Sequence, residues 1–370
     1  MSTVTFDVVR ASTKYVVDEN GDVSQVAANT PAFEYNADGT YKGMSVEKQR
    51  ENICLQSEDW SVSPWVAFTA GAGLTPTVTA DAGTAPDGTN NATRVQLDCD
   101  DDTVAANRSA WRQSITISNS TEYTVSFWYK AYDSSAIGDT VRVEHNNFSS
   151  LQGIITLTAD WQRYSFTSTS TGTSTSFLIE TKGGTTGQTA DILVWGAQFE
   201  AGANASSYIP TTTTSVTRNA DLISKTSAST YIGQTAGTVY VEATIDNIQP
   251  LQSIISVSDG SDDNIVRITF ASPDMRMYVK AGGATIIDDV ETIGAGTYKF
   301  AIVYSASDTR VYRNGVQLSS STTSLSFTSS VDEIDIGQSF ANTQQANNWI
   351  RAFALYKRAL TDTEAIALTS

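Results

Sequence analysis

The stretch EYTVSFWYKAY, residues 122–132, decides the predicted fold. Its side chains fall into two alternating sets: Tyr123, Val125, Phe127 and Tyr129 in one, and Thr124, Ser126, Trp128 and Lys130 in the other. Successive side chains of a β-strand point to opposite faces of the sheet. The stretch therefore predicts an antiparallel strand with one face in a core and the other face toward solvent.

Strands of the same kind recur at short intervals between residues 54 and 210, separated by turns rich in Gly, Asn, Asp and Ser. The predicted strands are 93–99, 110–117, 122–132, 140–148, 161–169, 175–181 and 191–200. Short strands at regular spacing with such turns are typical of antiparallel sandwiches and jelly rolls. We expect Trp111, in register with Ile115 and Ile117, to lie in the core. The same is expected of Trp195, which alternates with Leu193 and Phe199.

The strand pattern starts again near Asn219 and runs to the end of the chain. Asn314-Gly315 predicts a type I′ hairpin turn, and Thr361 with Glu364 forms a capping box that opens a short helix. The predicted strands are 237–246, 252–259, 264–271, 275–281, 297–305, 309–318, 331–337 and 348–357. A second sandwich with a terminal helix is therefore expected.

The first residues carry two hairpin signals, Asn20-Gly21 and Asp38-Gly39, and the segment Met44–Asn52 is compatible with one or two helical turns. They hold too few apolar residues for a core of their own, so we predict a β arm that leans on another part. The predicted organisation is an arm at 1–53, a jelly roll at 54–210, a Thr-rich linker at 211–218 and a second sandwich at 219–370.

Composition limits the function. The chain has 370 residues, 40% of them apolar and 17% charged, and a net charge of −17. This charge argues against nucleic acid and anionic membrane surfaces as partners. No apolar run approaches the ~20 residues of a membrane helix, and MSTVTFDVVR lacks the features of a secretory signal. A virus particle is assembled in the bacterial cytoplasm and released by lysis. A virion protein therefore fits both cytoplasmic synthesis and a composition typical of secreted β proteins.

Few residues here can support nucleophilic or metal chemistry. Cys54 and Cys99 are the only cysteines and His145 the only histidine. A Ser-His-Asp, Cys-His or multi-histidine site is therefore disfavoured. We expect the cysteines to be buried free thiols, with a disulfide as the alternative.

Several stretches resemble a recurrent family of bacteriophage virion fibre and spike proteins. Residues 10–60 resemble the opening of that family, although Cys54 stands where the family usually has Leu. Residues 78–96, 160–167 and 195–221 are similar to its carbohydrate-binding-module-like jelly roll. Residues 311–318, 333–338 and 354–368 resemble the laminin-G and concanavalin A-like lectin superfamily.

The resemblance implies a head-fibre, spike, decoration or tail-fibre subunit with glycan-binding sandwiches displayed outward. It also favours a homotrimer that docks on a capsid or tail protein of the same phage, and a location on the virion surface. The expected function is a structural virion protein without enzymatic activity that binds host surface glycans. Two alternatives stay open: a polysaccharide-degrading glycosidase of concanavalin-like fold, and a cell-surface lectin or adhesin.

One candidate ligand site follows from the alternation in residues 122–132. Trp128 shares its predicted solvent face with Ser126 and Lys130, and an indole beside polar groups can stack on a sugar ring. The alternative is that Trp128 packs against a neighbouring subunit or the arm. Trp65 is a second candidate ligand residue, although it and Trp60 are also compatible with a lid over one end of the sandwich.

Two acidic motifs raise the questions of glycoside hydrolysis and of a calcium site. DEIDIG, residues 332–337, resembles the strand of concanavalin-like glucanases that carries three carboxylates; Glu333 and Asp335 share a face, but Gly337 and Gln338 stand where the third would be. No catalytic residue is therefore predicted. Residues 97–103 offer four aspartates to a structural Ca²⁺ but lack the spacing of a calcium loop. A solvated acidic loop is the alternative, and no other cofactor is expected.

Overall fold

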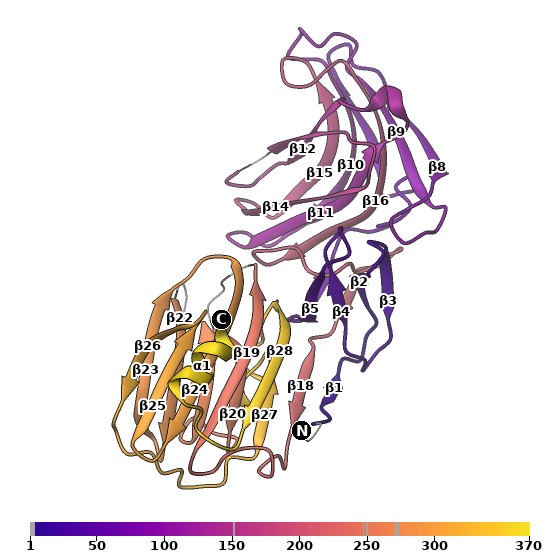
Figure 1. Ribbon diagram of the computed structural model, residues 1–370. Coiled ribbons are helices and arrows are strands. Elements are labelled where there is room, and N and C mark those ends of the chain that lie inside the picture. Colours follow the sequence, from indigo (N-terminus) through magenta and orange to yellow (C-terminus); the bar gives the residue numbers. More distant parts are fainter. Residues whose placement is uncertain (1–3, 151, 247, 249–250, 271–273) are drawn as a thin grey trace. The chain divides into compact units, whose positions relative to one another are not determined.

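The computed structural model describes residues 4–150, 152–246, 248, 251–270 and 274–370. In these ranges the chain is all-β apart from short 3₁₀ turns and one terminal α-helix, which confirms the predicted class (Figure 1). Residues 1–3 of the predicted arm and residue 271 of the predicted strand 264–271 lie outside them. The chain forms two compact units. The middle unit contains Asp22–Ser24 and Arg50–Arg218; the C-terminal unit contains Met1–Gly21, Gln25–Gln49 and Asn219–Ser370.

The middle unit pairs its strands, where described, into two five-stranded antiparallel sheets. The β11 sheet has the order β14-β11-β16-β9-β8, and the β10 sheet has the order β13-β12-β15-β10-β7; β6 and β17 pair separately. The bounds are β6 Arg50–Asn52, β7 Val66–Ala70, β8 Thr77–Gly83, β9 Ala92–Asp98, β10 Arg108–Thr116, β11 Glu122–Ala131, β12 Thr140–His145, β13 Gln152–Thr156, β14 Gln162–Thr169, β15 Ser174–Lys182, β16 Thr189–Ala201 and β17 Val216–Arg218, with a 3₁₀ turn at Ser134–Ala136.

The core of the middle unit is rich in aromatic side chains. Val125 and Phe127 of β11 are buried in it as predicted, and so is Trp111 of β10. Each such side chain contributes about 1.5–3 kcal/mol through the apolar surface that it removes from water. The only histidine, His145, lies in the same unit, and burial lowers its pKa to about 4. Both cysteines are buried and free, which confirms that prediction.

The alternation of β16 reverses at Gly196, whose φ is +68°. Val194 before it and Ala197 after it both belong to the core. The intervening Trp195 therefore points to the outward face of the β11 sheet, opposite the core. Trp195 is fully buried, as expected, but the prediction that it shares the core face with Phe199 is wrong. A side chain at Gly196 is blocked as well, because its Cβ would lie 2.8 Å from the ring of Trp128.

The C-terminal unit has two seven-stranded sheets among the residues described. The β20 sheet has the order β1-β18-β27-β20-β21-β22-β23, and the β19 sheet has the order β26-β25-β24-β19-β28-β5-β4. The bounds are β1 Asp7–Val9, β2 Lys14–Val17, β4 Phe33–Tyr35, β5 Tyr41–Val46, β18 Leu222–Lys225, β19 Gly237–Ile245, β20 Gln252–Ser258, β21 Ile265–Phe270, β22 Asp274–Ala281, β23 Ala284–Thr292, β24 Gly296–Ser305, β25 Asp308–Arg313, β26 Val316–Ser321, β27 Glu333–Ile336, β28 Asn348–Tyr356 and α1 Asp362–Thr369, with a 3₁₀ turn at Phe340–Asn342. Strand β3, Val23–Val26, is divided between the units.

The N-terminal arm is built into the sheets of the C-terminal unit. Strand β1 pairs with β18, and β5 pairs with β28. Val46 at the end of β5 is fully buried in the core of this unit. Strands β5 and β6 occupy the segment Met44–Asn52, so the helical turns considered there are absent; an available strand edge outweighs the weak helical preference of nine residues.

A buried ionic cluster fastens the arm to the strand that enters the C-terminal unit. Asp221 accepts hydrogen bonds from Arg10 Nη1 and Lys14 Nζ, both at 2.7 Å, and from the backbone amide of Glu47 at 3.0 Å. Lys14 also pairs with the Glu47 carboxylate at 2.9 Å. Charges this deeply buried are tolerated only when paired and hydrogen-bonded, so the arm and Asp221 depend on each other.

The local turn and cap predictions hold in the C-terminal unit. Asn314 and Gly315 both have positive φ, as a type I′ turn requires, and they join β25 to β26. Thr361 caps α1, and Glu364 completes the capping box. None of the helices in the described ranges has the length and apolar character needed to cross a membrane.

Candidate functional site

Trp128 lies on the outward face of the β11 sheet, as the alternation predicts, but it is not exposed. Its side chain is 7% accessible and packs edge-on against Trp195 and Tyr208. The guanidinium of Arg163 lies 4.4 Å from its ring centroid. The prediction that Trp128 and Ser126 face solvent is therefore wrong. Trp128 is buried, and Ser126 is fully buried.

The cover over Trp128 is the chain that follows β16, residues 203–211, which we call the covering segment. Ser206 donates from its amide and its hydroxyl to the Glu200 carboxylate, at 2.8 and 2.7 Å. The amide of Ile209 donates to Gln198 Oε1 at 2.8 Å. Tyr208 and Ile209 are each 2% exposed. These contacts hold the covering segment on one end of the outward face and remove that end from ligands.

Trp65 is also buried, in the core of the middle unit. Its ring stacks on Trp60 with centroids 4.1 Å apart, and its indole nitrogen donates to Gln56 O at 3.3 Å. Only 3% of its surface is accessible. The stack leaves neither ring face of Trp65 open to a sugar.

Lys130 is the one predicted ligand residue that stays near solvent. Its ammonium lies 5.1 Å from the ring centroid of Trp161, whose indole nitrogen donates to Thr84 O at 3.1 Å. Trp161 is partly exposed. Sequence reasoning missed Trp161 as a ligand residue; the available signal was its place in the predicted strand 161–169, where it shares a face with the polar residues Arg163 and Ser165.

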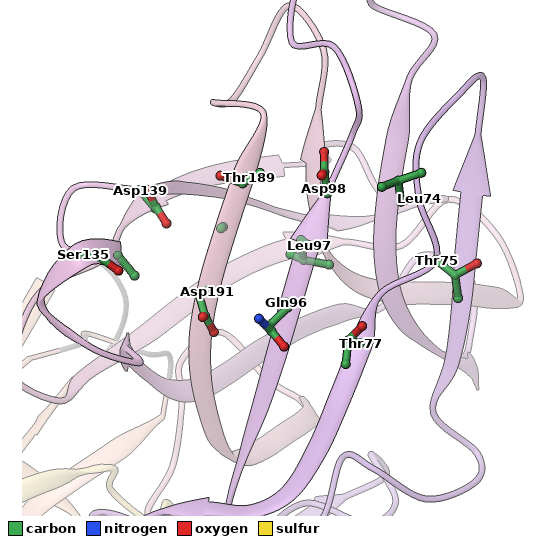
Figure 2. A pocket seen from close by; sticks show the side chains of 12 residues that line it. Leu74, Thr75, Thr77, Gln96, Leu97, Asp98, Ser135, Asp139, Thr189 and Asp191 are labelled. Atoms are coloured by element: carbon green, nitrogen blue, oxygen red, sulfur yellow. The ribbon is translucent and has the colours of Figure 1, made fainter.

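The other end of the same outward face contains a cavity of about 450 Å³ (Figure 2). Ser135 and Asp139 lie on one side, Thr75 and Thr77 on the other, and Gln96 and Asp191 between them. The register places Thr77 beside Gln96 on β8 and β9, and Gln96 beside Asp191 on β9 and β16. The complete lining is Leu74, Thr75, Thr77, Gln96, Leu97, Asp98, Ser135, Ala136, Asp139, Thr189, Ala190 and Asp191.

The cavity is lined by hydrogen-bond acceptors and hydroxyls, with three carboxyl groups and no lysine or arginine among its lining residues. Arg94, just outside it, donates to both oxygens of Asp191 at 2.8 and 2.5 Å and lies 3.6 Å from the centroid of the Tyr132 ring. Burial raises the pKa of Asp139; a hydrogen bond from the Asp191 backbone opposes this, and the Asp191 charge adds to it. Such a lining suits a neutral polyol and repels an anion.

The aspartates of residues 97–103 are divided between the cavity and a loop. Asp98 lines the cavity, whereas Asp101 accepts hydrogen bonds from the amide and hydroxyl of Thr103 at 2.8 and 2.6 Å. These bonds lower the pKa of Asp101. Among the residues described, no group of three or more acidic, histidine or cysteine side chains is placed to hold a metal ion.

Glu333 and Asp335 lie on β27 in the C-terminal unit, at alternate positions of one strand. Asp335 is 1% exposed; burial raises its pKa to about 7, the nearby charge of Glu333 adds to the rise, and Gln338 Nε2 at 3.3 Å opposes it. At Gly337, where a third carboxylate would stand, a Cβ would lie 2.3 Å from Val46 Cγ1. Strand β5 of the arm therefore leaves no room for a side chain at this position.

Comparison with known proteins identifies one region. Residues 238–365 match the family model described as the concanavalin A-like lectin/glucanases superfamily. No curated protein matches the sequence.

Solved structures with similar folds include the CBM40 of the Ruminococcus gnavus IT-sialidase, with 17% identity, 37% of this chain and 84% of the other covered, and a TM-score of 0.32. Domain 4 of the arabinanase AbnA from Geobacillus stearothermophilus, in complex with arabinotriose, has 12% identity, 41% and 73% coverage and a TM-score of 0.34. Tailspike protein 4 of bacteriophage CBA120 has 13% identity, 40% and 21% coverage and a TM-score of 0.30. The match over residues 238–365 lies in the C-terminal unit and agrees with the lectin-like resemblance of that part of the sequence.

Proposed function

We propose that this protein is a non-enzymatic fibre or spike subunit on a phage particle and that its middle unit binds neutral sugars of the host surface. The observation that carries the proposal is the uncovered polar cavity at the Gln96–Asp191 end of the β11 sheet. The location on the virion and the binding to a host surface are inferred from the family resemblance of the sequence. A trimer that docks on a capsid or tail protein is part of the same proposal.

The chemistry of the cavity supports a neutral sugar. Carboxylates and the Gln96 amide can accept hydrogen bonds from sugar hydroxyls, and bonds to charged acceptors are about twice as strong as neutral ones. Hydroxyls of Thr77, Thr189 and Ser135 can serve as donor or acceptor. The partly exposed Trp161 offers a ring face for stacking elsewhere on the same sheet, with Lys130 beside it. These are the groups that sugar-binding surfaces use.

The number and burial of the carboxyl groups on β27 support binding without hydrolysis. Glycoside hydrolysis of the usual kind needs an acid that protonates the leaving oxygen and a second carboxylate. Val46 stands against the position of the third carboxylate of the glucanase motif, and Asp335 is buried. A hydrolysis assay on capsular polysaccharides with the intact protein and with Glu333→Gln tests this part: activity lost in the variant would contradict it.

The sugar-binding part is tested with the full-length protein on an array of bacterial surface oligosaccharides, followed by calorimetry on those that bind. Gln96→Ala and Trp161→Ala should each weaken binding about tenfold or more. The matched control is Gln162→Ala, an exposed glutamine that does not line the cavity. Unchanged affinity in both variants, or no binding to any neutral oligosaccharide, would overturn the proposed site.

The virion part is tested separately. Mass spectrometry and antibody-labelled electron microscopy of purified particles should find the protein on the particle surface, and light scattering should give the mass of a trimer. A protein found only on the bacterial envelope would favour the lectin or adhesin alternative. A stable monomer would contradict the trimer without affecting the sugar site.

A further inference from the structure

A row of polar side chains crosses the outward face of the β20 sheet in the C-terminal unit. The register places Asp335 of β27 beside Ser256 of β20, Ser256 beside Arg267 of β21, and Arg267 beside Tyr278 of β22. Their neighbours in sequence, such as Val266, point into the core. This row lies in the C-terminal unit and contains none of the residues that line the cavity of the middle unit.

Arg267 is a buried cation whose hydrogen bonding is incomplete. It is 7% exposed; its Nη1 donates to Ser339 Oγ at 2.8 Å, and its Nε has no hydrogen-bond partner among the described residues. Burial lowers its pKa to about 10. A guanidinium taken out of water is stable only with anionic or hydrogen-bonding partners, so the position favours an additional acceptor.

Two further cations surround the same tyrosine. The guanidinium groups of Arg267 and Arg276 lie 4.6 and 4.7 Å from the Tyr278 ring centroid, and the Lys280 ammonium lies 6.0 Å from it. Arg276 pairs with Asp288. In a chain with a net charge of −17, these three side chains form a local cluster of positive charge, of which Arg276 is paired with Asp288. An anion is the ligand that this arrangement attracts.

The carboxylate of Asp262 contacts the Tyr278 hydroxyl and two of the three cations, Arg267 and Lys280. Its Oδ1 accepts a hydrogen bond from the Tyr278 hydroxyl at 2.9 Å and lies 3.5 Å from Arg267 Nη2, and its Oδ2 pairs with Lys280. Asp262 belongs to the turn between β20 and β21, and 42% of its side chain is exposed. A carboxylate that is part of a turn and faces solvent can be exchanged for an external one.

We propose that this face of the C-terminal unit binds a carboxylate-bearing sugar, such as a uronic acid in a polysaccharide, at the place that Asp262 occupies. Asp262 then acts as an internal competitor that keeps the cations paired until the ligand arrives. Ser256 and Asp335, next along the row, are buried and lie outside the part of the face that the ligand reaches. The site is distinct from the neutral-sugar cavity and opposite to it in charge.

The Asp262 carboxylate indicates which kind of anion the site would bind. The hydroxyl, guanidinium and ammonium groups are arranged around the two oxygens of a carboxylate, which a uronic acid reproduces. Because the protein as a whole is strongly acidic, it repels polyanions in general. Binding of a polyuronate therefore requires a local site.

The test uses the full-length protein, with polygalacturonate oligomers as the probe, in calorimetry at low salt. Asp262→Asn should bind about tenfold more tightly than the unaltered protein, because the competing charge is gone. Lys280→Gln and Tyr278→Phe should bind at least fivefold more weakly. Asp308→Asn is the matched control, an exposed aspartate paired with Arg310 elsewhere in this unit, and should leave the affinity unchanged.

Three outcomes would overturn the proposal: no gain in Asp262→Asn, no loss in Lys280→Gln, or equal binding of dextran sulfate, which would show a general polyanion surface. Circular dichroism and thermal unfolding establish that each variant folds. Trp161→Ala should leave polygalacturonate binding unchanged while it weakens neutral-sugar binding. Failure of one site is thus distinguishable from failure of the other.

Discussion

The two ends of the outward face of the β11 sheet have the same strand alternation and opposite fates. At one end, Trp128 and Trp195 are buried beneath the covering segment, residues 203–211. At the other end, Gln96 and Asp191 line a cavity of about 450 Å³. Alternation therefore assigns a side chain to a face, whereas exposure depends on which distant segment lies on that face.

The β20 sheet shows the same contrast. Asp335 and Ser256 are buried, and the loop after β27 lies over this region through bonds from Arg267 to Ser339 and from Thr269 to Gln344. Farther along the sheet, Lys280 keeps 25% of its side chain accessible. Covered ends should therefore control stability, and open ends should control binding.

The largest effect is expected at the covered end of the β11 sheet. Trp195→Ala removes a fully buried indole and should lower the free energy of unfolding of the middle unit by about 3–5 kcal/mol. Denaturant unfolding followed by circular dichroism measures it. A loss below about 1 kcal/mol would mean that the covering segment does not hold Trp195 in a packed site.

The next effect is a pH dependence in the C-terminal unit. The folded-state pKa of Asp335 is raised to about 7, so the folded state binds this proton more tightly than the unfolded chain does. Stability is therefore full below the unfolded pKa of about 4 and decreases as pH rises toward 7. Asp335→Asn stays neutral and should be more stable than the unaltered protein at pH 8, by roughly 2–4 kcal/mol relative to the difference at pH 4.

Calorimetric unfolding at pH 4 and pH 8 tests the behaviour of Asp335. The exposed substitution Asp308→Asn serves as the control, because its carboxylate is half open to water. An equal stability difference between Asp335→Asn and the unaltered protein at both pH values would show that folding does not raise the pKa of Asp335.

A smaller effect is expected from Tyr208→Phe. The hydroxyl of Tyr208 forms hydrogen bonds with Ser57 Oγ at 2.7 Å and Glu58 Oε1 at 3.2 Å. Because the ring packing is kept, the variant should lose about 1 kcal/mol of stability. The pKa of Glu58, already raised by burial, should rise further, because the Tyr208 bond lowers it. A carboxyl titration by NMR that finds Glu58 unchanged would place the hydroxyl elsewhere.

The smallest effect on stability is expected at the open end. Gln96 is half-buried in the wall of the cavity and has no part in the core, so Gln96→Ala should change the free energy of unfolding by no more than about 0.5 kcal/mol, while neutral-sugar binding decreases about tenfold. Measuring both quantities on one preparation sharpens the contrast with Trp195→Ala. A large loss of stability in Gln96→Ala would remove the distinction between the two ends.

Local features of the fold were predictable from the sequence because their causes are local. The Asn314-Gly315 turn, the Thr361–Glu364 capping box and the core positions Val125 and Phe127 depend only on nearby residues. Long-range features were not. The reversal at Gly196 needs a bulge opposite β11, and β5 joins the β19 sheet by pairing with β28, some 300 residues later.

Trp128 and Ser126 lie on the predicted face of the β11 sheet, but at the end that the covering segment buries and not at the end with the cavity proposed here as the site. Trp128 and Ser126 were placed on the outward face, yet two apolar residues in the polar stretch after β16, Tyr208 and Ile209, signal a segment that folds back. Their burial is what closes that end. Lys130 was placed correctly near solvent, and Trp161 beside it was missed although it shares a face of the predicted strand 161–169 with polar residues.

The most direct test of the central claim follows the indole N–H signals of the seven tryptophans by NMR while a neutral host-surface oligosaccharide is added. If the sugar binds only the uncovered part of the outward face, which includes the partly exposed Trp161, the signal of Trp161 should shift and those of Trp128 and Trp195 should not. A shift of the Trp128 signal at saturating sugar, with Trp161 unmoved, would show that the covering segment opens and that the binding end has been wrongly assigned.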